Sequence, residues 1–277
     1  MKHSKKSLIH TLNDIDLRPS KSYGQNFLID ENLTNKIIRK CNVSPVDNIL
    51  EIGPGLGALT YEFLKKGARV TAIEKDPRLF SYLKEHLSGY ENFTIHLGDV
   101  LKTPFTKNNL PSPPYKIVAN IPYNISSQII LKIIMHSHLF PEVYLGMQLE
   151  VAMRLAASEG SKTYGLLSPL LQLEYKSKII LSLSPACFHP SPKVTSAFLY
   201  IKRAHIFPQK EKENYFQFLK LSFSQRRKML IKMLKKRYAV DLIIRSFDKL
   251  KIQDKARAES ISPEKFYKLF KLLEKED

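Results

Sequence analysis

The sequence predicts a doubly wound, mostly parallel α/β sheet followed by a small helical domain. Short apolar runs alternate with segments of helical spacing up to about residue 201. Strands that alternate with helices in this way are typical of a parallel sheet with helices on both faces. After about residue 205 only helical spacing continues, and most of the excess positive charge lies there. A C-terminal helical domain is therefore expected.

Each strand is expected where a short apolar run ends at a glycine or a polar residue. The expected strands are 48–52, 69–73, 93–97, 115–119, 143–147, 175–183 and 196–201, and the last two are candidates for an antiparallel edge hairpin. The expected helices are 31–40, one ending near 66, 77–87, 127–135, 150–157, 164–172, 211–223, 227–236, 240–248 and 263–273. Asp30 is suited to cap the first of these helices, and Pro77 to open the third.

Length and charge divide the chain further. With 277 residues it is long enough for one large and one small domain. We expect a flexible N-terminus (1–20), a sheet domain (21–204) and a basic helical domain (205–277). Lys and Arg number 44 against 26 Asp and Glu, and residues 201–277 alone carry 21 against 10. This imbalance favours a nucleic-acid partner over a membrane, with a solubilising surface as the plain alternative.

Several classes of protein are disfavoured by what the sequence contains. Cys41 and Cys187 are the only cysteines, so a disulfide framework is not expected and a reducing compartment fits. No apolar run approaches the ~18 residues of a membrane span. His136 and His138 have i, i+2 spacing, which does not face one ligand on a helix, so no metal site is expected. These features favour a cytoplasmic protein.

A glycine-rich turn joins the first expected strand of the sheet to a helix. Gly53 and Gly55 lie in this turn, and glycine lets a ligand approach the backbone closely. Glu74 ends the next strand and Asp99 follows the third. A carboxylate at the first of these positions suits the hydroxyls of a ribose, and one at the second suits an adenine amino group. The pattern predicts an adenosine pocket, and an NAD site is its competitor because it shares the glycines and the acidic residue.

A second motif follows the strand 115–119. The Asn120 side chain and the Pro122 carbonyl can both accept a hydrogen bond from one amino group, and Tyr123 can stack on a flat ring. An exocyclic amine on a nucleobase fits this combination. An NAD site explains neither this motif nor the basic C-terminal domain, so the motif decides against NAD.

Short motifs recur in a fixed order between residues 21 and 266. They are 24–28 (GQNFL), 51–55 (EIGPG), 98–99 (GD), 120–125 (NIPYNI), 148 and 150–152 (Q, EVA), 164–165 (YG), 188–194 (FHPSPKV), 223–228 (FSQRRK) and 257–262 (RAESIS). In this order they resemble the ribosomal RNA adenine dimethyltransferase family, specifically its bacterial small-subunit branch. Ile121, Leu149, Lys232 and Lys75 depart from the residues usual in that family, and none touches the presumed chemistry.

The resemblance implies a Rossmann-like methyltransferase fold and S-adenosylmethionine as cofactor. By position, the cofactor-binding residues would be Asn26, Leu28, Gly53, Gly55, Glu74, Asp99 and Asn120. The implied enzyme is a 16S rRNA (adenine-N(6),N(6))-dimethyltransferase. It would dimethylate the exocyclic amines of two adjacent adenosines near the 3′ end of 16S rRNA, late in small-subunit biogenesis. Its partner would be the small ribosomal subunit, and it would act as a monomer.

The expected catalytic residues are Asn120, Pro122, Tyr123 and Phe188. Tyr123 would stack on one face of the target adenine, and Phe188 from the proline-rich loop would cover the other. Candidates for phosphate contact are Arg226, Arg227, Lys228, Lys235, Lys236 and Arg237. For any one of these cations, an ordinary solvated helix face is an equal alternative.

Two other functions stay open from the sequence. A related family branch methylates large-subunit rRNA, although the long basic C-terminal domain and the 188–194 block favour the small-subunit branch. An RNA-binding assembly factor with little turnover is a different class. The intact Glu74, Asp99 and Asn120 argue against it.

Overall fold

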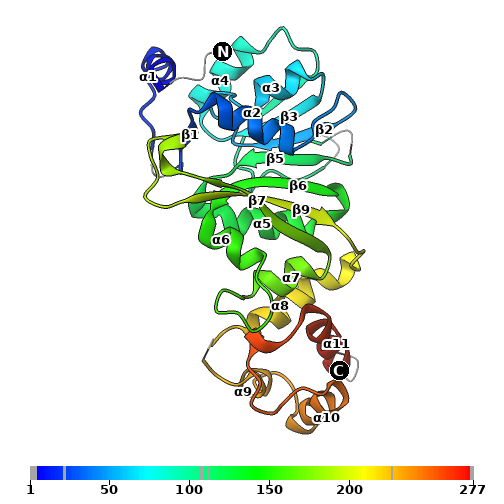
Figure 1. The fold of residues 1–277 in the computed structure, drawn as a ribbon. Helices are drawn as coiled ribbons and strands as arrows, with labels where there is room; N and C mark the ends of the chain where they lie inside the picture. Colours follow the sequence, from blue (N-terminus) through cyan, green and yellow to red (C-terminus); the bar gives the residue numbers. More distant parts are fainter. Residues whose placement is uncertain (1–4, 21–22, 107–108, 111–112, 226, 275–277) are drawn as a thin grey trace. The chain divides into compact units, whose positions relative to one another are not determined.

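The computed structural model describes residues 5–20, 23–106, 109–110, 113–225 and 227–274. A seven-stranded sheet with the strand order β4-β3-β2-β5-β6-β9-β7 is its central element (Figure 1). The strands are β2 (Asn48–Ile52), β3 (Arg69–Glu74), β4 (Phe93–Leu97), β5 (Lys116–Asn120), β6 (Glu142–Gln148), β7 (Tyr175–Leu183) and β9 (Ser196–Arg203).

The sheet is mostly parallel, which confirms the predicted fold class. β2 pairs in parallel with β3 and with β5, β3 pairs with β4, and β5 pairs with β6. β9 lies antiparallel to β6, between it and β7. The chain leaves β2 toward β3 and later returns to β5 on the other side of β2. Such a reversal opens a crevice at the carboxyl ends of the two strands, where ligands of α/β sheets bind.

Helices begin where the sequence supplies caps. α2 (Glu31–Lys40) starts after Asp30, whose side chain accepts a hydrogen bond from the amide of Leu33 at 2.9 Å. α4 (Pro77–His86) starts after Asp76 with a proline in its first turn. α3 (Thr60–Lys65), α5 (Ser126–Met135) and α6 (Leu149–Leu155) complete the helices that alternate with the strands. The caps fix where each helix starts relative to the strand end before it.

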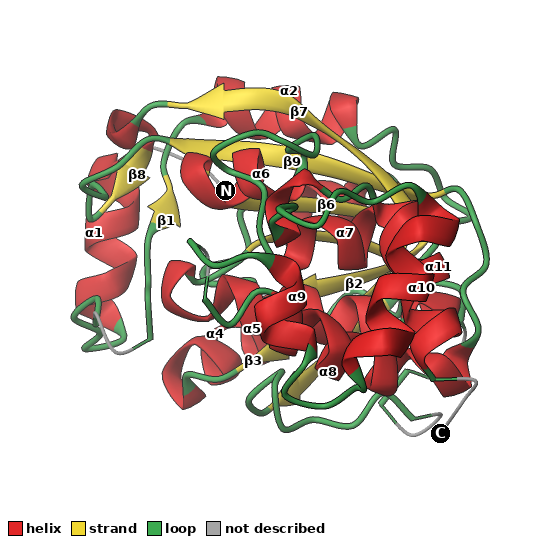
Figure 2. Ribbon diagram, turned by 90° about the horizontal axis from the view of Figure 1, so that it is seen from below, coloured by secondary structure: helices red, strands yellow, loops and turns green. Residues whose placement is uncertain are grey.

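A two-stranded sheet joins parts of the chain that are far apart in sequence. β1 (Phe27–Leu28) pairs antiparallel with β8 (Phe188–His189), and Figure 2 shows the two strands side by side. The sequence analysis expected no strand at either place. The pairing depends on the alignment of segments about 160 residues apart, which no local pattern encodes.

The chain divides into two compact units. The first comprises 1–152 and 178–202, and the second comprises 153–177 and 203–277. The second therefore includes a segment, 153–177, that the sequence analysis assigned to the sheet domain. Its helices are α7 (Leu167–Gln172), α8 (Lys212–Ser222), α9 (Leu230–Leu234), α10 (Val240–Leu250) and α11 (Pro263–Leu273). α7 and α9 are shorter than expected.

The N-terminal segment is more ordered than the sequence suggested. Within 1–20 we expected flexibility, whereas Lys5–Asp14 forms helix α1. Leu12 and Leu17 are buried, at 3% exposure each, in an apolar cluster with Phe27 and Leu79. Burial of these side chains supplies the stabilisation that a short isolated helix lacks. No helix in the described ranges is long and apolar enough to cross a membrane.

Candidate functional site

One cavity in the first unit collects the strand ends that the sequence analysis singled out. It is bordered by the ends of β2, β3 and β5, the turn after β4 and the loop that contains β1. The predicted residues that line it are Asn26, Leu28, Gly53, Gly55, Glu74, Asp99, Asn120, Pro122 and Tyr123. Every predicted cofactor-binding residue thus borders a single cavity, at the crevice between β2 and β5.

The turn after β2 exposes its backbone to this cavity. Gly53 and Gly55 have φ values of +66° and +62°, which L side chains rarely adopt. A Cβ at Gly53 would meet no other atom within 4 Å, whereas one at Gly55 would lie 3.1 Å from the ring of Phe27. Gly53 therefore leaves room for a ligand to approach the main chain, and Gly55 leaves room for β1.

Glu74 is held in one orientation at the end of β3. Its carboxylate accepts hydrogen bonds from the backbone N–H groups of Gly55 (3.2 Å), Lys75 (2.8 Å) and Asp76 (2.9 Å). The side chain is nearly buried, and burial raises its pKa above the ordinary value for a glutamate against the effect of these donors. A carboxylate aligned by fixed amides is suited to accept from ligand hydroxyls.

A second buried carboxylate, Glu51, borders the same cavity. The Thr60 hydroxyl donates to it at 2.6 Å. Burial raises the pKa of Glu51 to about 8, and nearby Glu74 adds to this effect. Glu51 is therefore mostly neutral at pH 7. A cation in the cavity would favour its ionised form.

Asp99 lies in the turn after β4. It accepts hydrogen bonds from Lys75 Nζ (3.0 Å) and from the amide of Leu101 (2.9 Å). Burial alone would raise the pKa of Asp99, but these two bonds and the positive charges of Lys75 and Lys102 together outweigh it, and the pKa is lowered. The side chain is therefore ionised at neutral pH and can accept a hydrogen bond from an amino group. Lys75, the departure noted in the sequence, directly contacts a predicted cofactor-binding residue.

Asn120 ends β5 with its amide in contact with the N-terminal loop. Nδ2 donates to the backbone oxygen of Asn26 at 3.2 Å. Oδ1 is buried and has no hydrogen-bond partner among the described residues. A buried acceptor without a donor is costly. Asn120 Oδ1 is therefore available to accept a hydrogen bond from the amino group of a ligand.

Tyr123 is anchored by a residue that the sequence analysis did not identify. Its hydroxyl hydrogen-bonds to Oγ of Ser196, a fully buried residue at the start of β9. This bond limits the rotation of the ring at the edge of the cavity. Ser196 could have been suspected only as a polar residue at the start of an apolar strand.

The N-terminal loop packs directly on the Asn120–Tyr123 motif. Gly24 has a φ of +63°, and a Cβ there would lie 2.7 Å from Asn124 Oδ1 and 3.0 Å from Pro122 Cβ. Only glycine allows this approach without displacing a neighbour. The loop and the motif are therefore parts of one site, although about 100 residues separate them in sequence.

Phe188 does not reach the cavity. It is 2% exposed, packs in the apolar core of the first unit and pairs with Leu28 across the β1–β8 sheet. The expectation that Phe188 stacks on the target base is therefore corrected for this structure. The aromatic ring packs instead in the apolar cluster that also contains Leu28, its partner across the β1–β8 sheet.

The predicted phosphate-contacting residues lie in the second unit. Arg227 and Lys228 precede α9, Lys235, Lys236 and Arg237 follow it, and all five are exposed. Arg237 also forms an ion pair with Glu274 at 2.8 Å, so its charge is partly neutralised. Arg226 is outside the described residues. In the described part of the chain, no group of three or more His, Cys, Asp or Glu is placed to hold a metal ion.

Comparisons with known proteins identify a family. A family model for ribosomal RNA adenine dimethylase matches residues 17–275. The "Ribosomal RNA small subunit methyltransferase A" of Syntrophotalea carbinolica is 42% identical over 266 residues, covering 93% of this chain and 97% of that protein. The protein of the same name from Ureaplasma urealyticum is 38% identical over 263 residues, covering 93% of each.

Solved structures are similar over most of the chain. A dimethyladenosine transferase from Plasmodium falciparum has a TM-score of 0.73 at 26% identity, covering 88% of this chain and 95% of its own. The 23S rRNA methyltransferase ErmE has a TM-score of 0.68 at 26% identity, covering 90% and 100%. These matches confirm the resemblance found in the sequence motifs: the chain belongs to the ribosomal RNA adenine dimethylase family.

Proposed function

We propose that this chain is an S-adenosylmethionine-dependent enzyme that dimethylates two adjacent adenosines near the 3′ end of 16S rRNA. One observation carries the proposal. A single cavity joins an adenosine-type pocket, with Gly53, Glu74 and Asp99, to the amine-accepting motif that starts at Asn120. A methyl donor and a target amine would therefore meet in one site. The relatives named small subunit methyltransferase A support the choice of rRNA.

The cavity residues fit the cofactor. Gly53 leaves its backbone open to a ligand, Glu74 offers a carboxylate aligned by three amides, and Asp99 offers an ionised carboxylate. When bound, the cofactor would supply a methyl group attached to a positively charged sulfur. The pKa of Glu51 is about 8, and the positive charge of the bound cofactor would lower it and so favour the ionised carboxylate.

The mechanism depends on positioning rather than on a strong base. An adenine amine is a poor nucleophile because its lone pair is delocalised into the ring. Asn120 Oδ1 and the Pro122 carbonyl can accept its two hydrogens and favour a tetrahedral nitrogen. The Pro122 carbonyl has one long contact, 3.4 Å from the amide of Ile125, and keeps acceptor capacity. Positioning and electrostatics of this kind lower barriers without proton abstraction by the protein.

In each transfer Asn120 Oδ1 and the Pro122 carbonyl would hold the target amine so that its nitrogen lone pair points toward the methyl group that the bound cofactor would supply. The proton that the amine loses on methylation would pass to solvent. Tyr123, held by Ser196, would stack on the base after it leaves its helix stack. The second transfer requires the monomethylated amine to rotate while it keeps one acceptor contact.

The basic second unit would supply affinity for the ribosomal partner. Its exposed cations around α9 suit phosphate contacts that add salt-dependent binding without reading sequence. We place the rRNA contact in residues 205–277 and the chemistry in residues 21–204. We further propose that the enzyme acts as a cytoplasmic monomer, late in small-subunit assembly.

The decisive experiment supplies tritiated S-adenosylmethionine to the purified chain with unmethylated small subunits, naked rRNA and large subunits in parallel. Label on small subunits, mapped to two adjacent adenosines near the 3′ end, is expected. Label on large subunits alone would replace this proposal with methylation of 23S rRNA, the activity that the name of ErmE states. Tight small-subunit binding without label would favour an assembly factor.

A further inference from the structure

Helix α1 borders the cofactor cavity, although no motif of the sequence assigned it a role. Ser7, Leu8 and Thr11 line the same cavity as Glu74 and Asn120. These three residues share one side of the helix, because Thr11 lies four residues after Ser7 and three after Leu8, the spacings that make neighbours on a helical surface. α1 therefore contributes a wall to the cavity in addition to packing against the first unit.

An apolar seam holds α1 in this place. Leu12 is buried with Phe27 of β1 and Leu79 of α4, and Leu8 and Ile15 pack against the same cluster. Leu8, Leu12 and Ile15 follow helical spacing along one stripe. Phe27 and Leu79 also line the cavity. The seam therefore places α1 against two elements that themselves border the ligand site.

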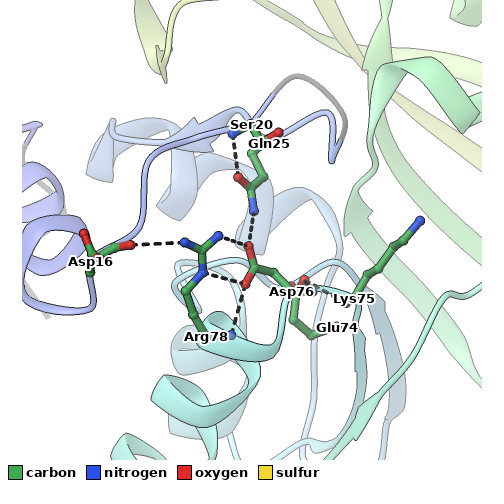
Figure 3. A network of polar contacts seen from close by, with 7 residues as sticks. All are labelled: Asp16, Ser20, Gln25, Glu74, Lys75, Asp76 and Arg78. Carbon is green, nitrogen blue, oxygen red and sulfur yellow. Dashed lines mark hydrogen bonds and ion pairs between the residues drawn. The ribbon is translucent and has the colours of Figure 1, made fainter.

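A polar network fixes the chain just after α1 (Figure 3). The backbone oxygen of Asp16 accepts from Arg78 Nη1 at 3.1 Å. Arg78 also donates to both carboxylate oxygens of Asp76, at 3.2 and 3.1 Å. Gln25 donates to Asp76 at 3.1 Å and accepts from the amide of Ser20 at 2.9 Å. Asp76, at the centre of the network, is fully buried, whereas the Arg78 side chain is 44% exposed.

The same turn that anchors α1 also orients Glu74. The Asp76 amide donates to the Glu74 carboxylate, and the Asp76 side chain receives Arg78. A single turn between β3 and α4 thus sets the position of a proposed cofactor-binding carboxylate and of the chain that follows α1. The position of α1 and the orientation of Glu74 therefore depend on the same turn.

We propose that α1 is a wall of the cofactor site, which contacts the bound ligand through Ser7, Leu8 and Thr11 and slows its release. Arg78 is a positioning residue, because it holds the chain after α1 and the Asp76 turn and does not itself line the cavity. The inference rests on the proposed function for the identity of the ligand, an adenosine-containing sulfonium compound or its thioether product. If α1 were only packing, ligand release would not depend on these side chains.

The chain contains no tryptophan, which permits a direct test with a single introduced fluorophore. In Ser7→Trp the indole would lie at the cavity wall, whereas in Ile9→Trp it would lie on an exposed position of the same helix. S-adenosylhomocysteine, a stable probe, is titrated into each full-length variant, and calorimetry measures binding independently. A saturable change in emission is expected for Ser7→Trp and none for Ile9→Trp. Confirmed binding without an emission change in Ser7→Trp would overturn the inference.

Release kinetics provide the second measurement. Dissociation of S-adenosylhomocysteine is expected to be about tenfold faster in Leu8→Ala and in Arg78→Ala, because each variant weakens the wall. Arg78→Lys should restore little, since an ammonium cannot match the forked geometry of arginine. The matched controls are Ile9→Ala on α1 and the exposed Lys84→Ala on α4. They should release the probe at the wild-type rate.

The outcomes separate the two proposals. A wild-type chain that does not bind S-adenosylhomocysteine would overturn the proposed function, and this inference with it. A wild-type chain that binds the probe and methylates small subunits, while the variants release it at the wild-type rate, would overturn only the role of α1. Thermal unfolding without ligand shows whether each variant folds. Ser7→Trp tests the contact even if Arg78→Ala is unstable.

Discussion

The two compact units use their charged residues differently. The first unit carries 21 Lys and Arg against 14 Asp and Glu, and it turns Glu51, Glu74 and Asp99 toward one cavity. The second carries 23 against 12 in far fewer residues, and its cations around α9 face solvent. A small ligand is recognised by the placement of a few groups, whereas a polyanion responds to summed surface charge. Ligand chemistry and polyanion affinity should therefore be separable by mutation.

The core of the second unit combines aromatic rings with a buried ion pair. Tyr215, Phe218, Phe266 and Phe270 pack against one another in the second unit, with Tyr215 stacked on Phe218 and edge to face with Phe270. One ion pair is buried beside them: Lys212 Nζ lies 2.9 Å from a Glu174 oxygen, with the side chains 2% and 4% exposed. Glu174 belongs to the segment 153–177, so this pair ties that segment to the C-terminal helices. Removing this ion pair therefore tests how strongly the segment 153–177 is held to the C-terminal helices.

The largest expected effect is on this buried pair. Lys212→Ala would remove a buried cation that lies 2.9 Å from the buried Glu174 carboxylate, and the free energy of unfolding should fall by about 3–5 kcal/mol, as when one partner of a buried ion pair is removed. Urea denaturation measures the change, with the exposed Lys220→Ala of the same helix as the matched control. A loss below about 1 kcal/mol would mean that the charge is paired or hydrated in another way.

The next effect concerns chemistry in the first unit alone. Asn120→Ala removes the acceptor for the target amine, and the rate of methyl transfer should fall by about 10²–10³-fold, as when a transition-state hydrogen bond is lost. Cofactor affinity and small-subunit affinity should change little. The exposed Asn35→Ala of α2 serves as the control. Parallel loss of transfer and of both binding steps would assign Asn120 a structural role.

A smaller effect is expected at the surface of the second unit. Replacing Lys235 and Lys236 with alanine should reduce the salt dependence of small-subunit binding. For each phosphate interaction that is removed, the slope of log K against log salt should become shallower by about 0.7–0.9. Cofactor binding should be unchanged. The paired control replaces Lys36 and Lys40, which are exposed on α2. Equal slopes for the two double variants would place the rRNA contact elsewhere.

The smallest effect tests Lys75 in the cofactor cavity. Lys75→Met removes the bond to Asp99, and cofactor affinity at pH 7 should change by no more than about fivefold, since a partly exposed ion pair contributes about 1 kcal/mol or less. The pH dependence should change more clearly. The pKa of Asp99 is lowered in the wild type, so the carboxylate stays ionised until the pH falls well into the acid range. Without Lys75 that pKa rises, and binding should weaken at a higher pH on acidification. Calorimetric titrations from neutral pH down to below the ordinary pKa of an aspartate give both acid limbs as far as the fold survives, and identical limbs would contradict the role of Lys75.

The strand ends could be located from the sequence because their chemistry is local. Glu74, Asp99 and Asn120 each follow an apolar run, and the carboxyl ends of parallel strands meet at one edge of a sheet. Their convergence on one cavity follows from that geometry. The ordered motifs, which depend on residue identity alone, predicted the family that the comparisons confirm.

Other parts of the site depend on contacts between distant segments. Phe188 was placed on the target base because it lies among prolines. Its pairing partner, Leu28, lies 160 residues earlier, and that pairing buries the ring. The bond from Tyr123 to Ser196 is equally non-local. Local patterns carry no information on such pairs, because register is set by packing of the whole sheet.

By itself the sequence determined the sheet class, the charged surface of the C-terminal helices and the residues at three strand ends. Each of these depends on periodicity, composition or chain order. Only the tertiary structure decided that α1 borders the cavity and that Phe188 does not. Both outcomes depend on which apolar side chains share one core: Leu12 packs in a cluster with Phe27, and Phe188 packs in a cluster with Leu28. Which side chains are buried depends on contacts between distant segments, so the tertiary structure was needed to establish it.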